Sequence, residues 1–434
     1  MPSSNLRVRL GRSMPLVALL AGSVGGAGFA HAQCVTGWVP AAAGSDPGAA
    51  IRWLQMWDAD GAGPTAPVLV GVGDLAGGIA SWDGSSWSVI GGGLDGPGYC
   101  LSTLPSNNHL LVAGPNFNNA GGNPARRVAQ WDGASWAAMD TGTGGPALTL
   151  LNVTAVGPSS AVVTGAFTSI NGVSALRIAR WTDGLGWEAL GEGMSSTTSC
   201  AALMPNGDII AGGAALSSGS TTINRIARWD GSTWNALGSG TGGLVRCLKV
   251  MPNGDLIAGG AFTTAGGSAA NYIARWDGTS WSALGDGMNL DVYALAVLPD
   301  GTLVAAGDFT SAGGHPAERL AFWRNGAWTA PESGLSAVVR AAEVLPDGDL
   351  VVGGDFLMAG GAPSAHFARY HFCPDTCAAD FNGDGFLDFF DYDDYVNCFE
   401  TATCPPGKTA DFNGDGFADF FDYDAFVAAF ETGC

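Results

Sequence analysis

The chain has 434 residues, of which 68 are glycine, 47% are hydrophobic and only 13% are charged. So much glycine disfavours long helices, whereas the apolar content is ample for a large core, so the composition predicts an all-β body of short strands and tight turns. The 39 acidic residues outnumber the 18 basic ones, which leaves no basic stripe for phosphates and argues against a nucleic-acid partner.

The first 32 residues have the pattern of a secretory signal peptide. Three arginines precede an apolar run, and the small-x-small site Ala30-His31-Ala32 ends directly before Gln33. Glycines interrupt the run, which falls short of the roughly 20 apolar residues that a membrane-spanning helix needs. We therefore expect a secreted, extracellular protein with no transmembrane segment, associated with the cell surface through protein contacts.

Residues 33–373 contain a motif repeated seven times. Clear copies are RIARWTDGLGWEALGEG, RIARWDGSTWNALGSG and YIARWDGTSWSALGDG, each with an Asp-Gly turn between two aromatic-containing strands. The first aromatic of each copy falls at Trp82, Trp131, Trp181, Trp229, Trp276, Trp323 and Tyr370. A second hairpin, such as VYALAVLPDGTLVAAGDF, lies between copies. Two hairpins in about 50 residues give four strands, which predicts a seven-bladed β-propeller.

The seventh copy ends without its second Trp-led strand. The segment TGWVP at residues 36–40 resembles that missing strand, so we expect the N-terminal strand to complete the last blade and hide two open sheet edges. Aligning Trp38 with Trp281, and Tyr370 with Trp276, places Cys34 opposite Cys373. A disulfide between these two cysteines is therefore predicted to replace the hairpin loop.

The repeats GAFTTAGG, GDFTSAGG and GDFLMAGG, with their WDG hairpins, resemble kelch-like and cortical-marker-type propellers of secreted and cell-surface proteins. This resemblance implies the fold but no function, because propellers include both enzymes and binding proteins. The histidines are scattered among blades and predict no metal cluster. We expect the WDG and PDG aspartates to cap turns rather than to act as glycosidase carboxylates. The paired tryptophans are either packing between blades or a sugar platform.

Residues 374–434 contain two nearly identical acidic stretches, ADFNGDGFLDFFDYDDY from Ala379 and ADFNGDGFADFFDYDAF from Ala410. Each places oxygen-bearing groups at positions 1, 3, 5, 7, 9 and 12 of a calcium loop, with glycine at position 6. The predicted ligands, two of them backbone carbonyls of phenylalanine, are Asp380, Asn382, Asp384, Phe386, Asp388, Asp391, Asp411, Asn413, Asp415, Phe417, Asp419 and Asp422. Crowded carboxylates repel one another unless a hard cation lies between them, so two calcium ions are predicted as cofactors.

Aromatic residues at helical spacing follow each loop, so one helix is expected after each. Paired loop–helix repeats that end a secreted chain resemble dockerin domains. The sequence motif of these repeats is similar to that of GC-type dockerin-anchored bacterial proteins. The resemblance implies a cohesin-like receptor, but cohesin-binding dockerins commonly carry Ser-Thr at loop positions 10 and 11. Here those positions hold Phe389-Phe390 and Phe420-Phe421. The aromatic pairs are either core residues or a docking surface for a different receptor.

The nine cysteines form two main groups. Four flank the acidic repeats and are expected to stabilise this small domain by disulfides: Cys377, Cys398, Cys404 and Cys434. Three occupy like places in the inner strands and are expected to be buried thiols: Cys100, Cys200 and Cys247.

The sequence favours a secreted, non-catalytic recognition or scaffold propeller for a glycan or protein ligand. The dockerin-like domain would anchor it to a surface receptor or an extracellular complex. The alternative is a carbohydrate-active enzyme, a glycoside hydrolase or lyase, delivered to a polysaccharide-degrading complex by its dockerin. A cluster of acidic side chains at one mouth of the ring would favour this alternative.

Overall fold

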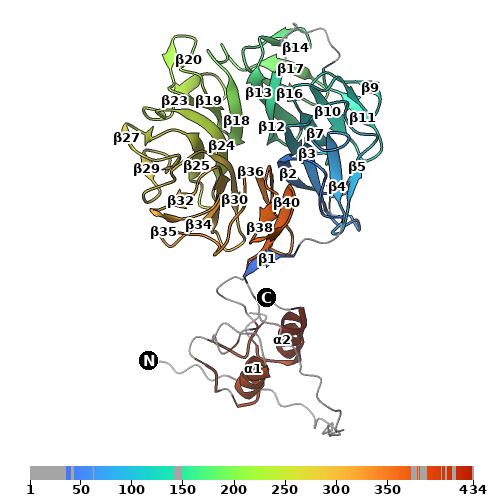
Figure 1. Cartoon of the computed structure of the whole chain (residues 1–434), viewed down its shortest axis with the longest axis vertical. Coiled ribbons are helices and arrows are strands. Elements are labelled where there is room, and N and C mark those ends of the chain that lie inside the picture. The colour runs from blue at the N-terminus through green and yellow to red at the C-terminus, as the bar shows by residue number, and fades with distance from the viewer. Residues whose placement is uncertain are drawn as a thin grey trace. The chain divides into compact units, whose positions relative to one another are not determined.

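The structure is a computed structural model that divides into two compact units, one of which is Gly37–His371. It describes residues 36–40, 44–61, 63–140, 149–372, 379, 381, 389–401, 403–405, 408–412 and 417–432. The side chains of residues 389, 390, 431 and 432 are outside this description. Figure 1 shows the larger unit as blades arranged around a common centre, and two helices in the smaller unit.

The larger unit contains seven four-stranded antiparallel sheets, which confirms the predicted seven-bladed propeller. The innermost strands, in chain order, are β2 (Ile51–Trp57), β6 (Cys100–Thr103), β12 (Thr149–Gly157), β18 (Thr198–Leu203), β24 (Leu244–Val250), β30 (Val292–Val297) and β36 (Val339–Val344). The second strands are β3 (Val68–Gly73), β7 (Leu110–Ala113), β13 (Ser160–Ala166), β19 (Ile209–Gly213), β25 (Leu256–Ala261), β31 (Leu303–Gly307) and β37 (Leu350–Gly354). The third strands are β4 (Ile79–Trp82), β10 (Val128–Trp131), β16 (Ile178–Thr182), β22 (Ile226–Trp229), β28 (Ile273–Trp276), β34 (Leu320–Arg324) and β40 (Phe367–His371). The outermost strands are β5 (Trp87–Val89), β11 (Trp136–Ala138), β17 (Gly186–Ala189), β23 (Trp234–Ala236), β29 (Trp281–Ala283), β35 (Ala327–Thr329) and β1 (Gly37–Val39).

Six blades also carry a short two-stranded ribbon between their second and third strands. The ribbons are β8 (Asn119–Ala120) with β9 (Asn123–Pro124), β14 (Ser169–Ile170) with β15 (Val173–Ser174), β20 (Ser217–Ser218) with β21 (Thr221–Thr222), β26 (Thr264–Ala265) with β27 (Ser268–Ala269), β32 (Ser311–Ala312) with β33 (His315–Pro316), and β38 (Met358–Ala359) with β39 (Ala362–Pro363). Several of them are formed by the repeated AGG-containing segments of the sequence.

The last blade is assembled from both ends of the propeller segment. The order of its strands is β1-β40-β37-β36, so the N-terminal strand supplies the outermost position. Trp38 lies opposite Tyr370, in the same register as Trp281 opposite Trp276 in the fifth blade. The ring is therefore closed by noncovalent strand pairing, which leaves no open edge at the seam. Cys34 and Cys373, the predicted disulfide pair, lie outside the described residues.

The outermost tryptophan of every blade connects that blade to its neighbour. Each indole N–H donates a hydrogen bond of 2.6–3.1 Å to a backbone carbonyl about one repeat away in the ring. The donor–acceptor pairs are Trp38–Ser333, Trp87–Ser45, Trp136–Gly91, Trp187–Met139, Trp234–Leu190, Trp281–Leu237 and Trp328–Leu284. Large rings at one repeated position thus fill the spaces between blades, which favours packing over a sugar platform.

The WDG aspartates cap their turns, as the sequence predicted. Asp83 Oδ1 accepts hydrogen bonds from the backbone N–H groups of Ser85 and Ser86, each at 2.8 Å, and Asp277 has the same arrangement. Bonding to these N–H groups and to nearby hydroxyls lowers the pKa of Asp83 to about 2. Gly84 follows with a φ of 97°, a conformation that favours glycine.

The smaller unit contains α1 (Phe389–Thr401) and α2 (Phe420–Thr432), so one helix follows each acidic loop as predicted. Residues 31 positions apart contact each other: the rings of Tyr395 and Phe426 stack at 4.0 Å, and the hydroxyls of Tyr392 and Tyr423 are hydrogen-bonded. Phe381, which precedes α1, also packs edge-on against Tyr395 at 5.1 Å. Each repeat therefore completes the aromatic core of the other, which explains why the motif occurs twice.

Candidate functional sites

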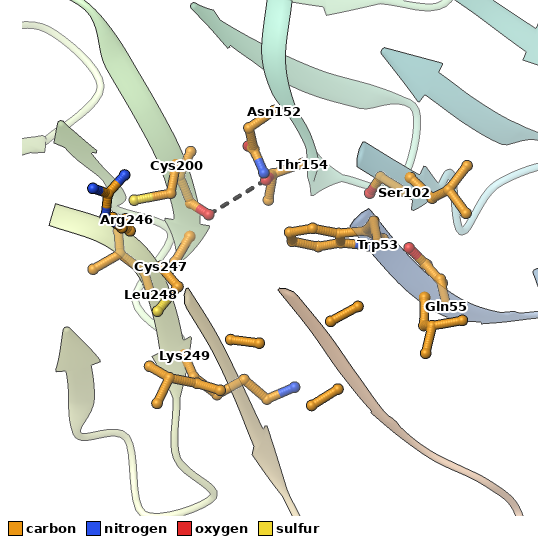
Figure 2. A pocket seen from close by; sticks show the side chains of 18 of the residues that line it. Trp53, Gln55, Ser102, Asn152, Thr154, Cys200, Arg246, Cys247, Leu248 and Lys249 are labelled. Carbon is orange, nitrogen blue, oxygen red and sulfur yellow. Dashed lines mark hydrogen bonds between the residues drawn. The ribbon is translucent and has the colours of Figure 1, made fainter. Parts of the chain in front are cut away.

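The centre of the propeller contains a cavity of about 360 Å³ that is lined by all seven innermost strands. Most of its wall is apolar, contributed by leucine, valine and alanine. Figure 2 shows the ring of Trp53, from β2, facing the open space from one side and the Lys249 side chain, from β24, extending into it from another. A volume of this size, with a few polar groups on an apolar wall, is typical of small-molecule sites.

One mouth of this cavity carries a ring of cationic and aromatic side chains. Most innermost strands have a register shift near their first residues, and the extra residue is Arg52, Arg246, Tyr293 or Arg340 in four of the blades. The guanidinium groups of Arg246 and Arg340 lie 4.8 and 5.7 Å from the centre of the Tyr293 ring, which places all three side chains together. Such bulges redirect side chains, here toward the mouth.

Three carboxylates near this mouth are engaged in ion pairs. Asp74 pairs with Arg52 at 2.7 Å. Asp291 pairs with Arg246 at 2.8 Å, and Asp355 pairs with Arg340 at 2.5 Å. Glycoside hydrolysis requires two carboxyl groups that are available as acid and as base or nucleophile. The observed Asp–Arg ion pairs instead hold the side chains at the mouth of the cavity in fixed positions.

Deeper in the cavity, the level formed by Gln55, Ser102, Thr154, Lys249 and Glu343 is polar. Three of these side chains connect neighbouring innermost strands: Gln55 Nε2 donates to Thr103 Oγ1 at 3.2 Å, Ser102 Oγ accepts from the Ala155 N–H at 2.8 Å, and Thr154 Oγ1 donates to the Ala201 carbonyl at 3.3 Å. These bonds hold the wall of the cavity in a fixed shape.

Among the described residues that line the cavity at this level, Lys249 and Glu343 are the charged ones. Burial raises the pKa of Glu343 to about 7, while the positive charge of Lys249 and a hydrogen bond from the Met56 backbone act in the opposite direction. Burial thus favours the protonated form of Glu343 more than it would be favoured in an exposed glutamate. Within the part of the chain that the structure describes, Lys249 makes no hydrogen bond or ion pair.

The three inner-strand cysteines are buried free thiols, as the sequence predicted. Burial raises the pKa of Cys100 and of Cys247 to about 12. Cys100 Sγ also donates to the Val153 carbonyl of the next innermost strand at 3.3 Å. These thiols are wall-packing groups in their neutral form rather than nucleophiles.

Sequence reasoning missed Trp53, Lys249 and Glu343. A signal was present, since the positions of Lys249 and Glu343 correspond to alanines, Ala202 and Ala296, in two other blades. The repeat motif drew attention to residues that recur, whereas a ligand site in a repeat protein depends on residues that differ between repeats.

The structure describes five of the twelve predicted calcium ligands: Asp391, Asp411, Phe417, Asp419 and Asp422. The other seven lie outside the described residues: Asp380, Asn382, Asp384, Phe386, Asp388, Asn413 and Asp415. Among the described side chains, no group of three or more metal-ligating residues comes together. This leaves both calcium loops as predictions.

The described end of the second loop is compatible with a cation. Asp422, in the first turn of α2, is fully buried, and its two carboxylate oxygens accept the N–H groups of Phe412 and Asp419, each at 2.8 Å. Asp419 caps the helix by accepting the Phe421 N–H at 2.9 Å. A carboxylate oxygen has two lone pairs, so accepting an N–H does not prevent it from binding a hard cation. Asp391, the counterpart of Asp422 in α1, is also fully buried.

The structure describes one of the two aromatic pairs and one disulfide of the smaller unit. The side chains of Phe420 and Phe421 are 58% and 70% exposed, so this aromatic pair does not belong to the core. The side chains of Phe389 and Phe390 lie outside the description. Among the cysteines that flank the repeats, Cys398 and Cys404 form a disulfide.

No helix in the described parts of the chain has the length and apolar character of a membrane span.

Residues 252–276 and 345–371 match the family described as "Domain of unknown function (DUF5122) beta-propeller", and these segments cover equivalent parts of the fifth and seventh blades. Comparison with curated proteins gives no match.

Two of the solved structures with similarity to this chain are the following. One is the WD40 β-propeller domain of Doa1, with 13% identity and a TM-score of 0.48, covering 78% of this chain and 96% of that one. Another is YCF48 bound to a D1 peptide, with 15% identity and a TM-score of 0.46, covering 75% of this chain and 94% of that one.

Proposed function

We propose that this protein is a secreted, non-catalytic recognition or scaffold propeller, held at a surface or in an extracellular complex by a calcium-binding, dockerin-like C-terminal domain. In this proposal residues 1–32 are a signal peptide, residues 33–373 recognise the ligand and residues 374–434 provide the anchor. The observation that carries the anchoring role is Asp422, a fully buried carboxylate that spans the second loop from Phe412 to Asp419. A buried carboxylate in a domain with 14 acidic residues and one basic residue from Cys373 onward favours a bound cation.

The exposed aromatic side chains support a receptor contact on this domain. Phe417, Phe420 and Phe421 are 71%, 58% and 70% exposed and lie within five residues of one another. Clustered exposed aromatics are typical of protein interfaces. The receptor is cohesin-like or another surface protein with an apolar contact face, because the usual Ser-Thr positions are aromatic here.

Recognition is favoured over glycan hydrolysis by the ion pairs at the mouth of the propeller. A hydrolase or lyase delivered by the same anchor would need free carboxylates, and Asp74, Asp291 and Asp355 are each paired with an arginine. A hydrolase screen that detects polysaccharide cleavage, lost on changing one of these aspartates, would reverse this preference.

Calcium titration of the full chain tests the anchor. We expect two sites by isothermal titration and a gain of helical circular dichroism on adding calcium, because binding relieves carboxylate repulsion in the loops. Asp422→Ala should reduce the stoichiometry from two sites to one, whereas Asp424→Ala, which changes an exposed aspartate of the same helix, should retain both. No heat and no spectral change with the unmodified chain would rule out calcium as the cofactor.

A retention assay tests the division between the two domains. A chain that ends at residue 373 should appear in the medium, whereas the full chain should stay at the cell surface until a chelator is added. Retention of the shortened chain would place the anchor in the propeller instead.

A further inference from the structure

We propose that the central cavity binds a small monocarboxylate with an apolar ring, its carboxylate at Lys249 and its ring against Trp53. This inference names the ligand class of the recognition propeller and therefore rests on the proposed function. It depends on the cavity, on a lysine within it that makes no hydrogen bond or ion pair among the described residues, and on an aromatic side chain that projects toward the opening.

Lys249 supplies a positive charge inside the central cavity. The chain contains only two lysines, Lys249 and Lys408, and Lys249 is the one that lines the central cavity. Its neighbours at the same level, Ser102 and Thr154, satisfy their polar atoms across the gap to the next strand. Lys249 makes no such bond within the described residues, and its ammonium points into open space in Figure 2. A cation in a mostly apolar enclosure favours an anionic ligand group.

The rest of the cavity wall is mostly apolar and includes one aromatic side chain, Trp53. The indole of Trp53 forms no ring pair with another aromatic side chain in the described structure, unlike the outer-strand tryptophans. It packs partly against the neighbouring apolar clusters and projects toward the opening in Figure 2. The remaining wall near it is apolar, as at Leu101, Val153 and Leu248. About 360 Å³ accommodates one ring and a carboxylate. An apolar ring therefore suits this wall better than a heavily hydroxylated sugar ring.

Glu343 lies at the same level of the cavity as Lys249. As a carboxylic acid it donates a hydrogen bond to a ligand carboxylate, but as a carboxylate it repels the ligand. Since burial raises the pKa of Glu343 to about 7, this side chain loses its proton between pH 6 and pH 8, and the affinity should fall over that range. The charged or titratable groups that line the cavity around it are Arg340 and Tyr293 at the mouth, Arg246, Cys247 and Lys249 on β24, and Cys200 on β18.

The binding experiment uses the full chain with four probes: benzoate, cyclohexanecarboxylate, benzyl alcohol and glucuronate. We expect one site for each of the first two acids at pH 6, and binding of benzyl alcohol at least about tenfold weaker because it lacks the charge. Lys249→Met should weaken benzoate at least about tenfold, and the matched control Lys408→Met should not change it. Equal affinity for benzyl alcohol, or an unchanged Lys249→Met variant, would overturn the proposal. Tighter binding of glucuronate than of benzoate would overturn the assignment of an apolar ring.

Two further measurements do not depend on folding of the Lys249 variant. In the unmodified protein, benzoate should protect Lys249 from acetylation and leave Lys408 unprotected, as read by peptide mass spectrometry. The variant Glu343→Gln should bind benzoate equally at pH 6 and pH 8, because its amide cannot ionise. If benzoate does not reduce the acetylation of Lys249, the proposed site is contradicted. A pH dependence of benzoate binding that is retained in Glu343→Gln would also contradict it. These results are independent of calcium binding and surface retention, so failure here leaves the anchoring proposal standing, and failure there leaves this one.

Discussion

Replacing Trp38 with alanine tests whether β1 locks the propeller ring. The indole N–H donates to the Ser333 carbonyl at 2.6 Å, a bond with a net value of about 1 kcal/mol. The ring also packs edge-on against Tyr370 at 5.1 Å, which adds about 1 kcal/mol. The indole is half-buried, so its apolar surface contributes roughly another 1 kcal/mol. We therefore expect Trp38→Ala to reduce the free energy of unfolding by about 3 kcal/mol, the sum of these contributions, measured by urea denaturation with circular dichroism of the strands.

A matched position provides the control. Trp281 occupies the same place in the fifth blade, donates to the Leu237 carbonyl at 2.9 Å and is only 9% exposed, but its strand is joined to β28 by a covalent turn. Trp281→Ala should cost about 3–5 kcal/mol. Trp38→Phe keeps a ring and loses the hydrogen bond, so a loss of about 1 kcal/mol is expected. If Trp38→Ala unfolds within about 0.5 kcal/mol of the unmodified chain while Trp281→Ala is strongly destabilised, β1 does not lock the ring.

Three further predictions concern cysteines and acid. Cys100 and Cys247 should react with a thiol reagent at pH 8 only in denaturant, because burial raises both pKa values to about 12; rapid labelling of the native protein would contradict this. Reducing the Cys398–Cys404 disulfide, which closes a short loop, should destabilise the smaller unit by about 2 kcal/mol, seen as a lower melting temperature of its helical signal; an unchanged melting temperature would contradict it. Asp83 has a lowered pKa in the folded state, so its stabilising contribution is fully present above pH 3.8 and is lost as the pH falls toward 2; a carboxyl titrating near 4 by NMR would be inconsistent with the observed turn.

Much of the propeller could be predicted from the sequence. The number of blades follows from seven copies at a nearly constant period, and the pairing of Trp38 with Tyr370 follows from matching TGWVP to the strand absent from the last copy. These features are local and repeated, because each hairpin is specified by its own turn residues and strand alternation. The helix after each acidic loop is equally local, and its start after Asp419 is fixed by a cap that the sequence contains.

The candidate ligand site was decided by the tertiary structure. Trp53, Lys249 and Glu343 come from strands nearly 300 residues apart at the extremes, and they meet only because closing the ring brings seven innermost strands around one axis. The same is true of Phe420 and Phe421: helical spacing shows that aromatics share a helix, but only the packing of the paired repeat decides which of them are buried. Sequence periodicity specifies each unit and its neighbours, whereas convergence at an axis and exposure on a surface depend on how the units close, which local interactions do not encode.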